Sequence, residues 1–202
     1  TNLTRLQADM AKICQTEIDM FGSAPFQNYT FMTMATGNSY GGLEHCNSTS
    51  LITPRDDLPK ADEAEEPSKD YQRFLGLCSH EYFHSWLVKF IRPENFVNYD
   101  LNKESYTSLL WIFEGFTSYY DDLILLRSGV ISQKSYLELL KAQIDRYLQN
   151  PGRAIQTVAE SSFDAWVKFY RQDENSNHAG TSYYNKGCLV ALCLDLGLRL
   201  RG

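Results

Sequence analysis

Two histidines and a glutamate stand at a spacing that suits metal chemistry. His80, Glu81 and His84 form an H-E-x-x-H run inside an apolar stretch, residues 74–90, whose pattern predicts a single helix. Residues four apart share one face of a helix, so both imidazoles can point at one metal ion. Glu81 lies one step round and can take a proton from water at that metal. An ordinary amphipathic helix can also carry such a run by chance.

A third metal ligand is predicted further along the chain. Catalytic zinc sites use three protein ligands and keep one position open for water or substrate. Glu114 is the only charged residue in 105–120, among large apolar neighbours, where a buried carboxylate is costly unless paired or metal-bound. Glu114 could instead face a groove or pair with Lys89, but a His/His/Glu set explains both features at once. We therefore predict one Zn²⁺ ion held by His80, His84 and Glu114.

Paired glycines precede a further acid. Gly41 and Gly42 stand just before Glu44, after a strand-like run over residues 29–34. Glycines let a backbone lie close to a bound peptide, and Glu44 beside them can receive a positive group. A Gly-Gly hairpin with an exposed acid explains the same residues equally well. Gly115, which follows the third predicted ligand, also permits a backbone or a substrate to come close.

Two adjacent tyrosines open the last predicted helix. Thr181 or Ser182 is expected to cap it, which places Tyr183 and Tyr184 in its first turn. A phenol at the positive end of a helix can donate a hydrogen bond to a developing oxyanion. A chain with 13 tyrosines also supplies such placements by coincidence.

These pieces, in this order, resemble the glycyl aminopeptidase family. Members of that family are zinc metallopeptidases of the gluzincin type, usually with a PDZ domain after the catalytic domain. The resemblance runs from Tyr29 to Arg199. The stretches that carry it are YGGLEHCNST (40–49), HEYFHSW (80–86), WIFEGFTSYY (111–120), ESSFDAW (160–166) and SYYNKG (182–187).

The resemblance implies a catalytic set and a reaction. His80, His84 and Glu114 are the implied zinc ligands, and Glu81 is the implied general base. The expected substrate is a peptide with a free N-terminus, cut at its first bond, with small first residues such as glycine or alanine favoured. A zinc endopeptidase and a degenerate, zinc-stabilised binding module are the alternatives. An intact Glu81 argues against the binding module, because a purely structural zinc site needs no base.

The resemblance also implies how the substrate is held. Glu44 matches the acid of the Gly-x-x-Glu motif, which binds the free α-amine in the larger alanyl aminopeptidase group. Tyr184 matches the tyrosine of the Tyr-x-Lys-Gly motif, which steadies the tetrahedral intermediate. Tyr183 is its adjacent rival, and His178 is a third candidate.

The chain departs from the family after the second histidine. Relatives usually read Trp-Asn-Val-Lys-Arg-Ile-Arg-Pro, whereas residues 86–93 here read Trp-Leu-Val-Lys-Phe-Ile-Arg-Pro. Leu87 and Phe90 thus replace polar residues, which puts details of the subsites in question. Every implied ligand is retained, so we expect the chemistry to be kept.

Periodicity predicts helices for most of the chain and strands near its start. The expected class is α+β, mostly α-helical, and the resemblance implies a thermolysin-like zincin catalytic domain. Strands are expected at 29–35 and 47–53. Helices are expected at 3–21, 68–90 and 103–127, from a Ser132 cap to Asn150, from a Ser161 or Ser162 cap through Tyr170, and from 183 onward.

Length and composition limit the remaining possibilities. The 202 residues suit one catalytic domain, residues 1–202, and a start without methionine suggests a segment of a longer protein, with flanking β and PDZ domains outside it. A net charge of −6 offers no basic surface for nucleic acid. No apolar run nears the roughly 18 residues of a membrane span. Five unpatterned cysteines indicate reduced thiols, as in a cytoplasmic protein.

Overall fold

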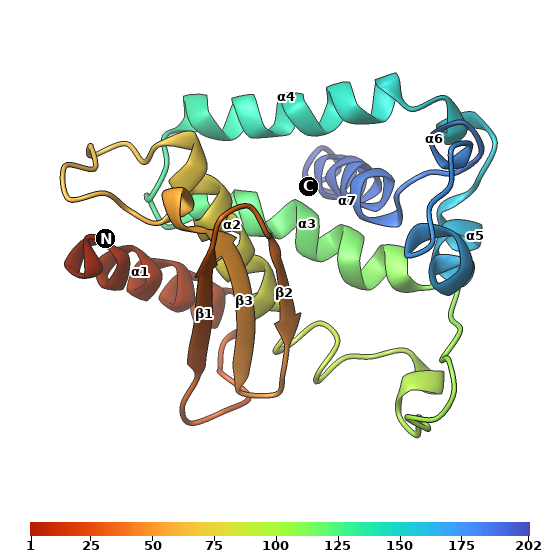
Figure 1. Cartoon of the computed structure of the whole chain (residues 1–202), viewed down its shortest axis with the longest axis horizontal. Helices are drawn as coiled ribbons and strands as arrows, with labels where there is room; N and C mark the ends of the chain where they lie inside the picture. Colours follow the sequence, from red (N-terminus) through yellow and green to blue (C-terminus); the bar gives the residue numbers. More distant parts are fainter. The chain divides into compact units, whose positions relative to one another are not determined.

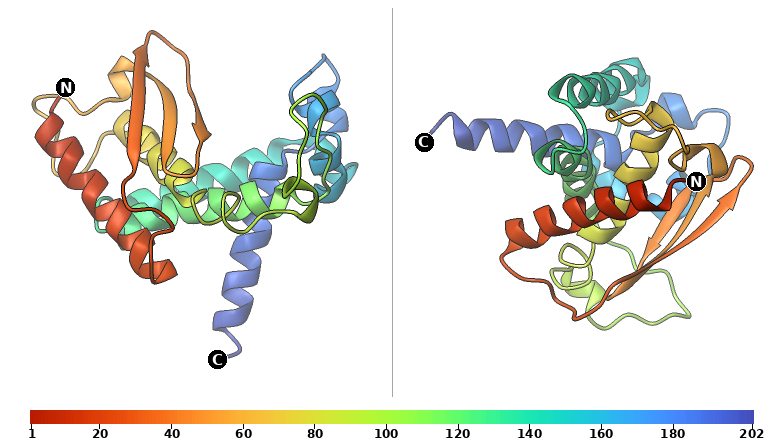
Figure 2. Two further views of the ribbon diagram at one scale, coloured as in Figure 1. Left: turned by 90° about the horizontal axis from the view of Figure 1, so that it is seen from below. Right: turned by 90° about the vertical axis from the view of Figure 1, so that its left-hand side faces the viewer.

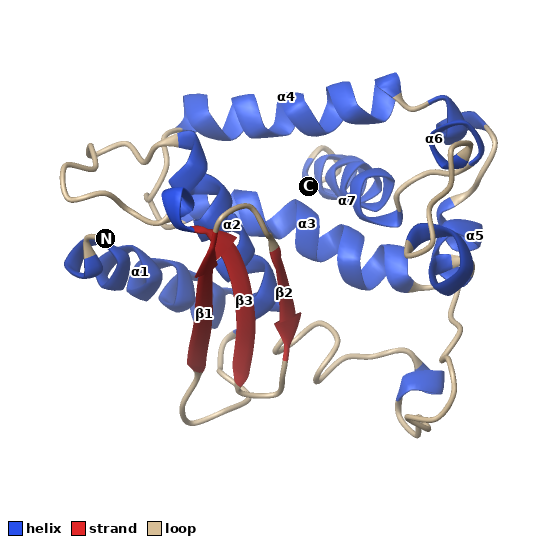
Figure 3. Cartoon of the chain, viewed as in Figure 1, coloured by secondary structure: helices blue, strands red, loops and turns tan.

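The computed structural model describes residues 1–202 (Figure 1). These residues form two compact units. The first unit comprises residues 1–90 and 120–137, and the second comprises residues 91–119 and 138–202. The chain is mostly helical and has one three-stranded sheet, so the predicted α+β class is confirmed (Figure 3). None of its helices is both long enough and apolar enough to cross a membrane.

Two helices of the first unit start where they were predicted to start. Helix α1, Leu3–Phe21, begins after Asn2, whose side chain accepts a hydrogen bond from the Arg5 amide, and ends at Gly22 with φ 82°. Helix α2, Lys69–Phe83, begins after the Ser68 cap. Both caps satisfy amide groups that a helix start leaves without a partner.

The sheet differs from prediction at the paired glycines. Strands β1, Thr30–Thr36, and β3, Ser48–Pro54, pair in parallel within a residue of the predicted bounds. Strand β2, Gly41–Glu44, pairs antiparallel with β3, which gives the order β1-β3-β2. The alternative of a Gly-Gly hairpin is therefore wrong: the glycines lie in a strand, and the turn follows them, where the His45 amide bonds to the Ser48 carbonyl at 2.8 Å.

The sheet packs against α2 through alternate residues of β3. Thr49, Leu51 and Thr53 are buried, whereas Ile52 between them is exposed, as expected for one covered face. Strands β2 and β3 both contact α2. The buried face of the sheet thereby fixes the helix that carries both candidate histidines.

Helix α2 ends seven residues before its predicted end at residue 90. After Phe83 the amides of Ser85 and Trp86 bond to carbonyls three residues earlier, and the Lys89 amide returns to the His84 carbonyl at 3.0 Å. Val88 has φ 125°, a conformation outside any helix. A tight turn at residues 84–89 therefore takes the place of the last helical turns that were predicted, and the helix ends well before Pro93.

The second unit contains the remaining helices, two of which it shares with the first unit. Helix α3, Leu110–Arg127, begins in the second unit and ends in the first, whereas α4, Gln133–Gln149, runs the other way. Helix α3 starts later than predicted, just after the Thr107 side chain binds the Leu109 amide. The other helical segments are α5 (Val158–Phe163), a π-helix (Ala165–Phe169), α6 (Ser176–Ala179) and α7 (Tyr183–Arg199).

The first residues of two of these helices test the predicted caps. Helix α5 begins after Thr157, which forms a capping box with Glu160, so the predicted Ser161 or Ser162 cap is wrong. Helix α7 begins after Ser182, one of the two predicted caps, and its side chain accepts from the Asn185 amide. The far end of α7 extends away from α5 and α6 (Figure 2).

Helices α3 and α7 approach closely at two glycines. A methyl group at Gly115 would lie 2.5 Å from the Gly187 Cα atom, and one at Gly187 would lie 2.6 Å from the Trp111 carbonyl oxygen. The close approach predicted at Gly115 is thus made by another backbone. This crossing holds the helix of Glu114 against the helix of the paired tyrosines.

A pair of glycine substitutions on α7 tests the crossing. Gly187→Ala should lower the free energy of unfolding by about 1–3 kcal/mol, because the added methyl group forces the helices apart. Gly197→Ala, whose methyl group meets nothing within 4 Å, should raise that free energy by up to about 1 kcal/mol through helix propensity. Urea unfolding of both variants measures the difference, and equal effects would contradict the crossing.

Candidate metal centre

The two candidate histidines lie on the last turn of α2. His80 is within the helix and His84 is its C-cap, and the His84 amide bonds to the His80 carbonyl at 3.3 Å. The spacing of four residues is therefore kept although the helix ends there. The two ring centroids are 4.7 Å apart with the rings nearly perpendicular, at 89°.

Each imidazole has one nitrogen engaged by an acceptor of the protein. His80 Nδ1 lies 2.9 Å from Asp121 Oδ2, and His84 Nδ1 lies 2.9 Å from the Leu87 carbonyl oxygen. A carbonyl oxygen and a carboxylate accept hydrogen bonds, so each Nδ1 carries the proton. The lone pair of each neutral ring is then on Nε2, which is the arrangement that metal-binding histidines use.

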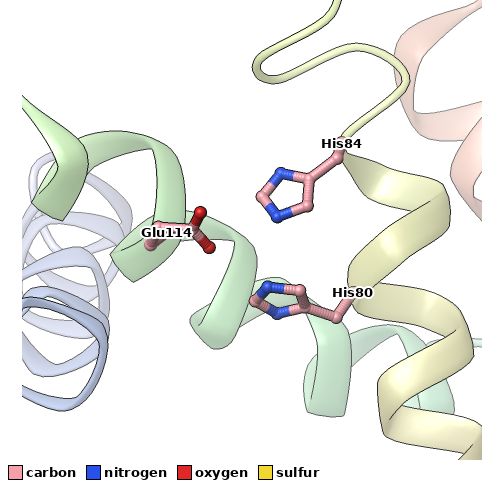
Figure 4. A group of neighbouring side chains, drawn as sticks. All are labelled: His80, His84 and Glu114. Carbon is pink, nitrogen blue, oxygen red and sulfur yellow. The ribbon is translucent and has the colours of Figure 1, made fainter. Parts of the chain in front are cut away.

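Glu114 completes a set of three possible ligands (Figure 4). His80, His84 and Glu114 each offer one ligand atom, and these atoms lie within 4.8 Å of one another. Atoms bound tetrahedrally at about 2.1 Å from zinc lie roughly 3.4 Å apart, a spacing within this limit. Two neutral imidazoles and a carboxylate are a donor set that fits a divalent zinc ion.

Glu81 lies on α2 between the histidines, and its carboxylate packs against strand β2. Its residue surface is only 5% exposed, and the Tyr29 hydroxyl donates to its backbone carbonyl at 3.2 Å. A methyl group at Gly42 would lie 2.6 Å from Glu81 Cγ and would overlap the carboxylate, whereas one at Gly41 would meet nothing within 4 Å. Of the two glycines, Gly42 is the one that makes room for an acid.

Glu44 ends strand β2 and forms an ion pair with Lys89. The Lys89 Nζ atom lies 2.9 Å from Glu44 Oε1. Lys89, which the sequence offered as a partner for Glu114, thus has a carboxylate partner within the first unit. The pair joins the strand that bears the glycines to the turn that follows the histidines.

The two tyrosines lie in the first turn of α7, as predicted, and α7 belongs to the second unit. Tyr183 is buried, and its hydroxyl donates to the Tyr170 hydroxyl at 3.4 Å, whereas Tyr184 is half-buried. Burial and then the Glu114 carboxylate raise the pKa of Tyr184, so its phenol stays protonated at neutral pH. His178 is exposed on the short helix α6. Tyr184 is therefore the more exposed of the two tyrosines, and the charge of Glu114 raises the pKa of both.

Three contributors to this centre were missed from the sequence. Asp121 follows Glu114 by seven residues, a spacing that returns to the same face of a helix and could have indicated it. The Leu87 carbonyl and the pairing of Lys89 with Glu44 depend on the turn after α2. No local pattern in the sequence indicates that turn.

The chain is similar to known peptidases. Residues 73–190 match the family described as M61 glycyl aminopeptidase. The structure is similar to the crystal structure of an aminopeptidase N family protein from Idiomarina loihiensis, with a TM-score of 0.96 and 53% sequence identity. That match covers 99% of this chain and 34% of the other, so the chain spans about a third of that protein's length. Among curated proteins, none matches the chain.

Removal of the Asp121 charge should weaken metal binding. Asp121→Asn keeps an oxygen near His80 Nδ1 but loses the carboxylate that fixes the ring, so zinc affinity should fall about 10- to 100-fold. Competition with a chromophoric chelator measures that affinity. Thermal unfolding of the metal-free variant controls for folding, and an unchanged zinc affinity would remove Asp121 from the centre.

Proposed function

The chain belongs to the M61 glycyl aminopeptidase family, and from this premise we propose that it is a zinc-dependent aminopeptidase that hydrolyses the first peptide bond of its substrates. Membership of a peptidase family indicates peptidase activity. The zinc, the bond that is cut and the roles of individual residues are proposed from the site. One observation carries the proposal: the ligand atoms of His80, His84 and Glu114 lie within 4.8 Å of one another.

His80, His84 and Glu114 would hold one zinc ion. Their fit rests on two rings whose Nδ1 atoms already face acceptors and on a half-buried carboxylate. When bound, zinc supplies a Lewis acid that acidifies water and polarises the scissile carbonyl. The thermolysin-like arrangement implied by the family suits this ligand set.

Glu81 is the proposed general base and acid. It accepts a proton from the attacking water and returns a proton to the departing amine. Its position on α2 between the two candidate histidines, and the room that Gly42 leaves for its carboxylate, support this role. The low exposure of Glu81 also limits its contact with bulk water, which strengthens its interactions with charge in the site.

Glu44 is the proposed anchor for the free N-terminus. A carboxylate that holds the substrate's ammonium fixes which carbonyl reaches the reaction centre, so the cut falls after the first residue. Strand β2, which ends at Glu44, is an edge strand of the sheet. An extended peptide can pair with such an edge and present its amine to the strand's end.

Tyr184 is the proposed oxyanion donor. Its raised pKa keeps the proton on the phenol, and its half-buried position leaves part of it accessible to substrate. Tyr183 has only 1% of its surface exposed, so it is less able to reach a substrate. A donor of this kind contributes about 3–4 kcal/mol to the transition state.

The family name supports a preference for glycine or another small first residue.

One contact bears on the endopeptidase alternative, in which Glu44 has only a structural role. Lys89 already neutralises the charge of Glu44, as such a role would require. If Glu44 were only structural, blocked and unblocked peptides would be cut alike. The two functions therefore differ in a measurable way.

Cleavage of paired reporters tests the proposal. Zinc-loaded protein should cleave alanyl and glycyl anilides with a free amine and leave their acetylated forms nearly untouched. Glu81→Gln should keep zinc, measured by metal analysis, and lose about 10³-fold or more in kcat, because proton transfer is lost. Equal cleavage of acetylated reporters would favour the endopeptidase, and a fully active Glu81→Gln variant would reject the base assignment.

A methyl group at Gly42 should disturb the base without removing the metal. Gly42→Ala overlaps the Glu81 carboxylate, so kcat should fall at least tenfold, in line with the 10²- to 10⁴-fold that general acid–base catalysis contributes. Zinc content should stay at the wild-type level. Gly37→Ala, also in the sheet region but with nothing within 4 Å of the added methyl, is the matched control and should keep the wild-type kcat.

A further inference from the structure

The carboxylate proposed to receive the substrate's amine already holds an ammonium group of the protein. Lys89 Nζ lies 2.9 Å from Glu44 Oε1, and the two side chains are only 28% and 21% exposed. A pair with this much burial is less screened by water and salt than a pair on the open surface. The contact is therefore a feature of the site that a bound substrate must meet.

An unusual backbone turn places Lys89 in this position. Val88 has φ 125°, a conformation that a β-branched residue rarely adopts. The turn around it is held by two hydrogen bonds: the Lys89 amide bonds to the His84 carbonyl at 3.0 Å, and the Leu87 carbonyl accepts from His84 Nδ1 at 2.9 Å. Strained residues that the surrounding structure holds in place cluster at functional sites.

The chemistry of Lys89 matches that of the proposed ligand. A lysine side chain ends in an ammonium group with three donors, the same group that a peptide carries at its free N-terminus. While Lys89 is bound, the charge of Glu44 is already neutralised. A second ammonium at the same carboxylate would be repelled by the first.

We propose that Lys89 is a specificity-determining residue that occupies Glu44 in the empty site and is displaced by the substrate's N-terminal ammonium. This proposal rests on the proposed role of Glu44 as the amine anchor. Substrate binding is then an exchange of one ammonium for another, so amine recognition is weaker than an unoccupied carboxylate would give. The flexible four-carbon stem and partial exposure of Lys89 give its head group a route to water.

Replacement of Lys89 should strengthen the binding of substrates with a free amine. In the full-length, zinc-loaded enzyme, Lys89→Met should lower KM for alanine 4-nitroanilide about three- to tenfold, with little change in kcat. The reason is that the Lys89 ammonium no longer competes with the substrate's ammonium for Glu44. Lys89→Gln serves as a second uncharged variant if Met lowers the thermal stability. Lys89→Arg keeps the charge and should stay closer to the wild-type KM than either.

A binding measurement separates affinity from turnover. In a Glu81→Gln background, calorimetric titration with the same anilide should show the same three- to tenfold gain in affinity for Lys89→Met. Lys141→Met removes a lysine from an exposed helical pair with Asp145 and is the matched control, with no change in KM. A KM that rises or stays constant in Lys89→Met would overturn the proposal, because Lys89 would then support Glu44 rather than compete for it.

Variants of Glu44 distinguish failure of this proposal from failure of the proposed function. If Glu44→Gln raises KM for the free-amine reporter while Lys89→Met leaves it unchanged, only the role of Lys89 is rejected. If Glu44→Gln has no effect, the amine anchor is wrong and the role of Lys89 falls with it. Lys89→Met should have no effect on KM in the Glu44→Gln background, because the neutral glutamine offers no negative charge for either ammonium.

Discussion

The candidate metal centre depends on two hydrogen bonds that hold the imidazole rings. His80 meets the Asp121 carboxylate and His84 meets the Leu87 carbonyl, each at 2.9 Å through Nδ1. These acceptors set the tautomer of each ring before any metal binds, so the ordering cost of the ligands is met by the fold. A helix alone brings the rings to one face, but the acceptors give them a defined direction.

Close backbone packing supports residues of the candidate site at two glycines. Gly42 lets strand β2 press against the Glu81 carboxylate, and Gly115 lets α7 approach the helix of Glu114. At both places a side chain as small as a methyl group would occupy space that a functional element uses. Glycine at these two positions thus leaves room for the Glu81 carboxylate and for the backbone of α7.

Much of this arrangement could be predicted from the sequence. The spacing of His80 and His84 predicted the shared helix face, and the isolation of Glu114 among apolar residues indicated a third candidate ligand that the structure brings to them. The turn after α2 could not be predicted, because Val88 has no local preference for its conformation. Strand β2 was missed for a related reason, since four residues with two glycines become a strand only by pairing with β3. The family resemblance, drawn from ordered motifs, is confirmed.

Helix α3 carries both Glu114, a candidate ligand, and Asp121, whose carboxylate binds the ring of the candidate ligand His80. Seven residues make nearly two full turns, so both carboxylates share a face. Loss or gain of one residue between them would rotate one against the other by about 100°. An insertion or deletion within this interval should therefore disturb the centre more than a substitution would.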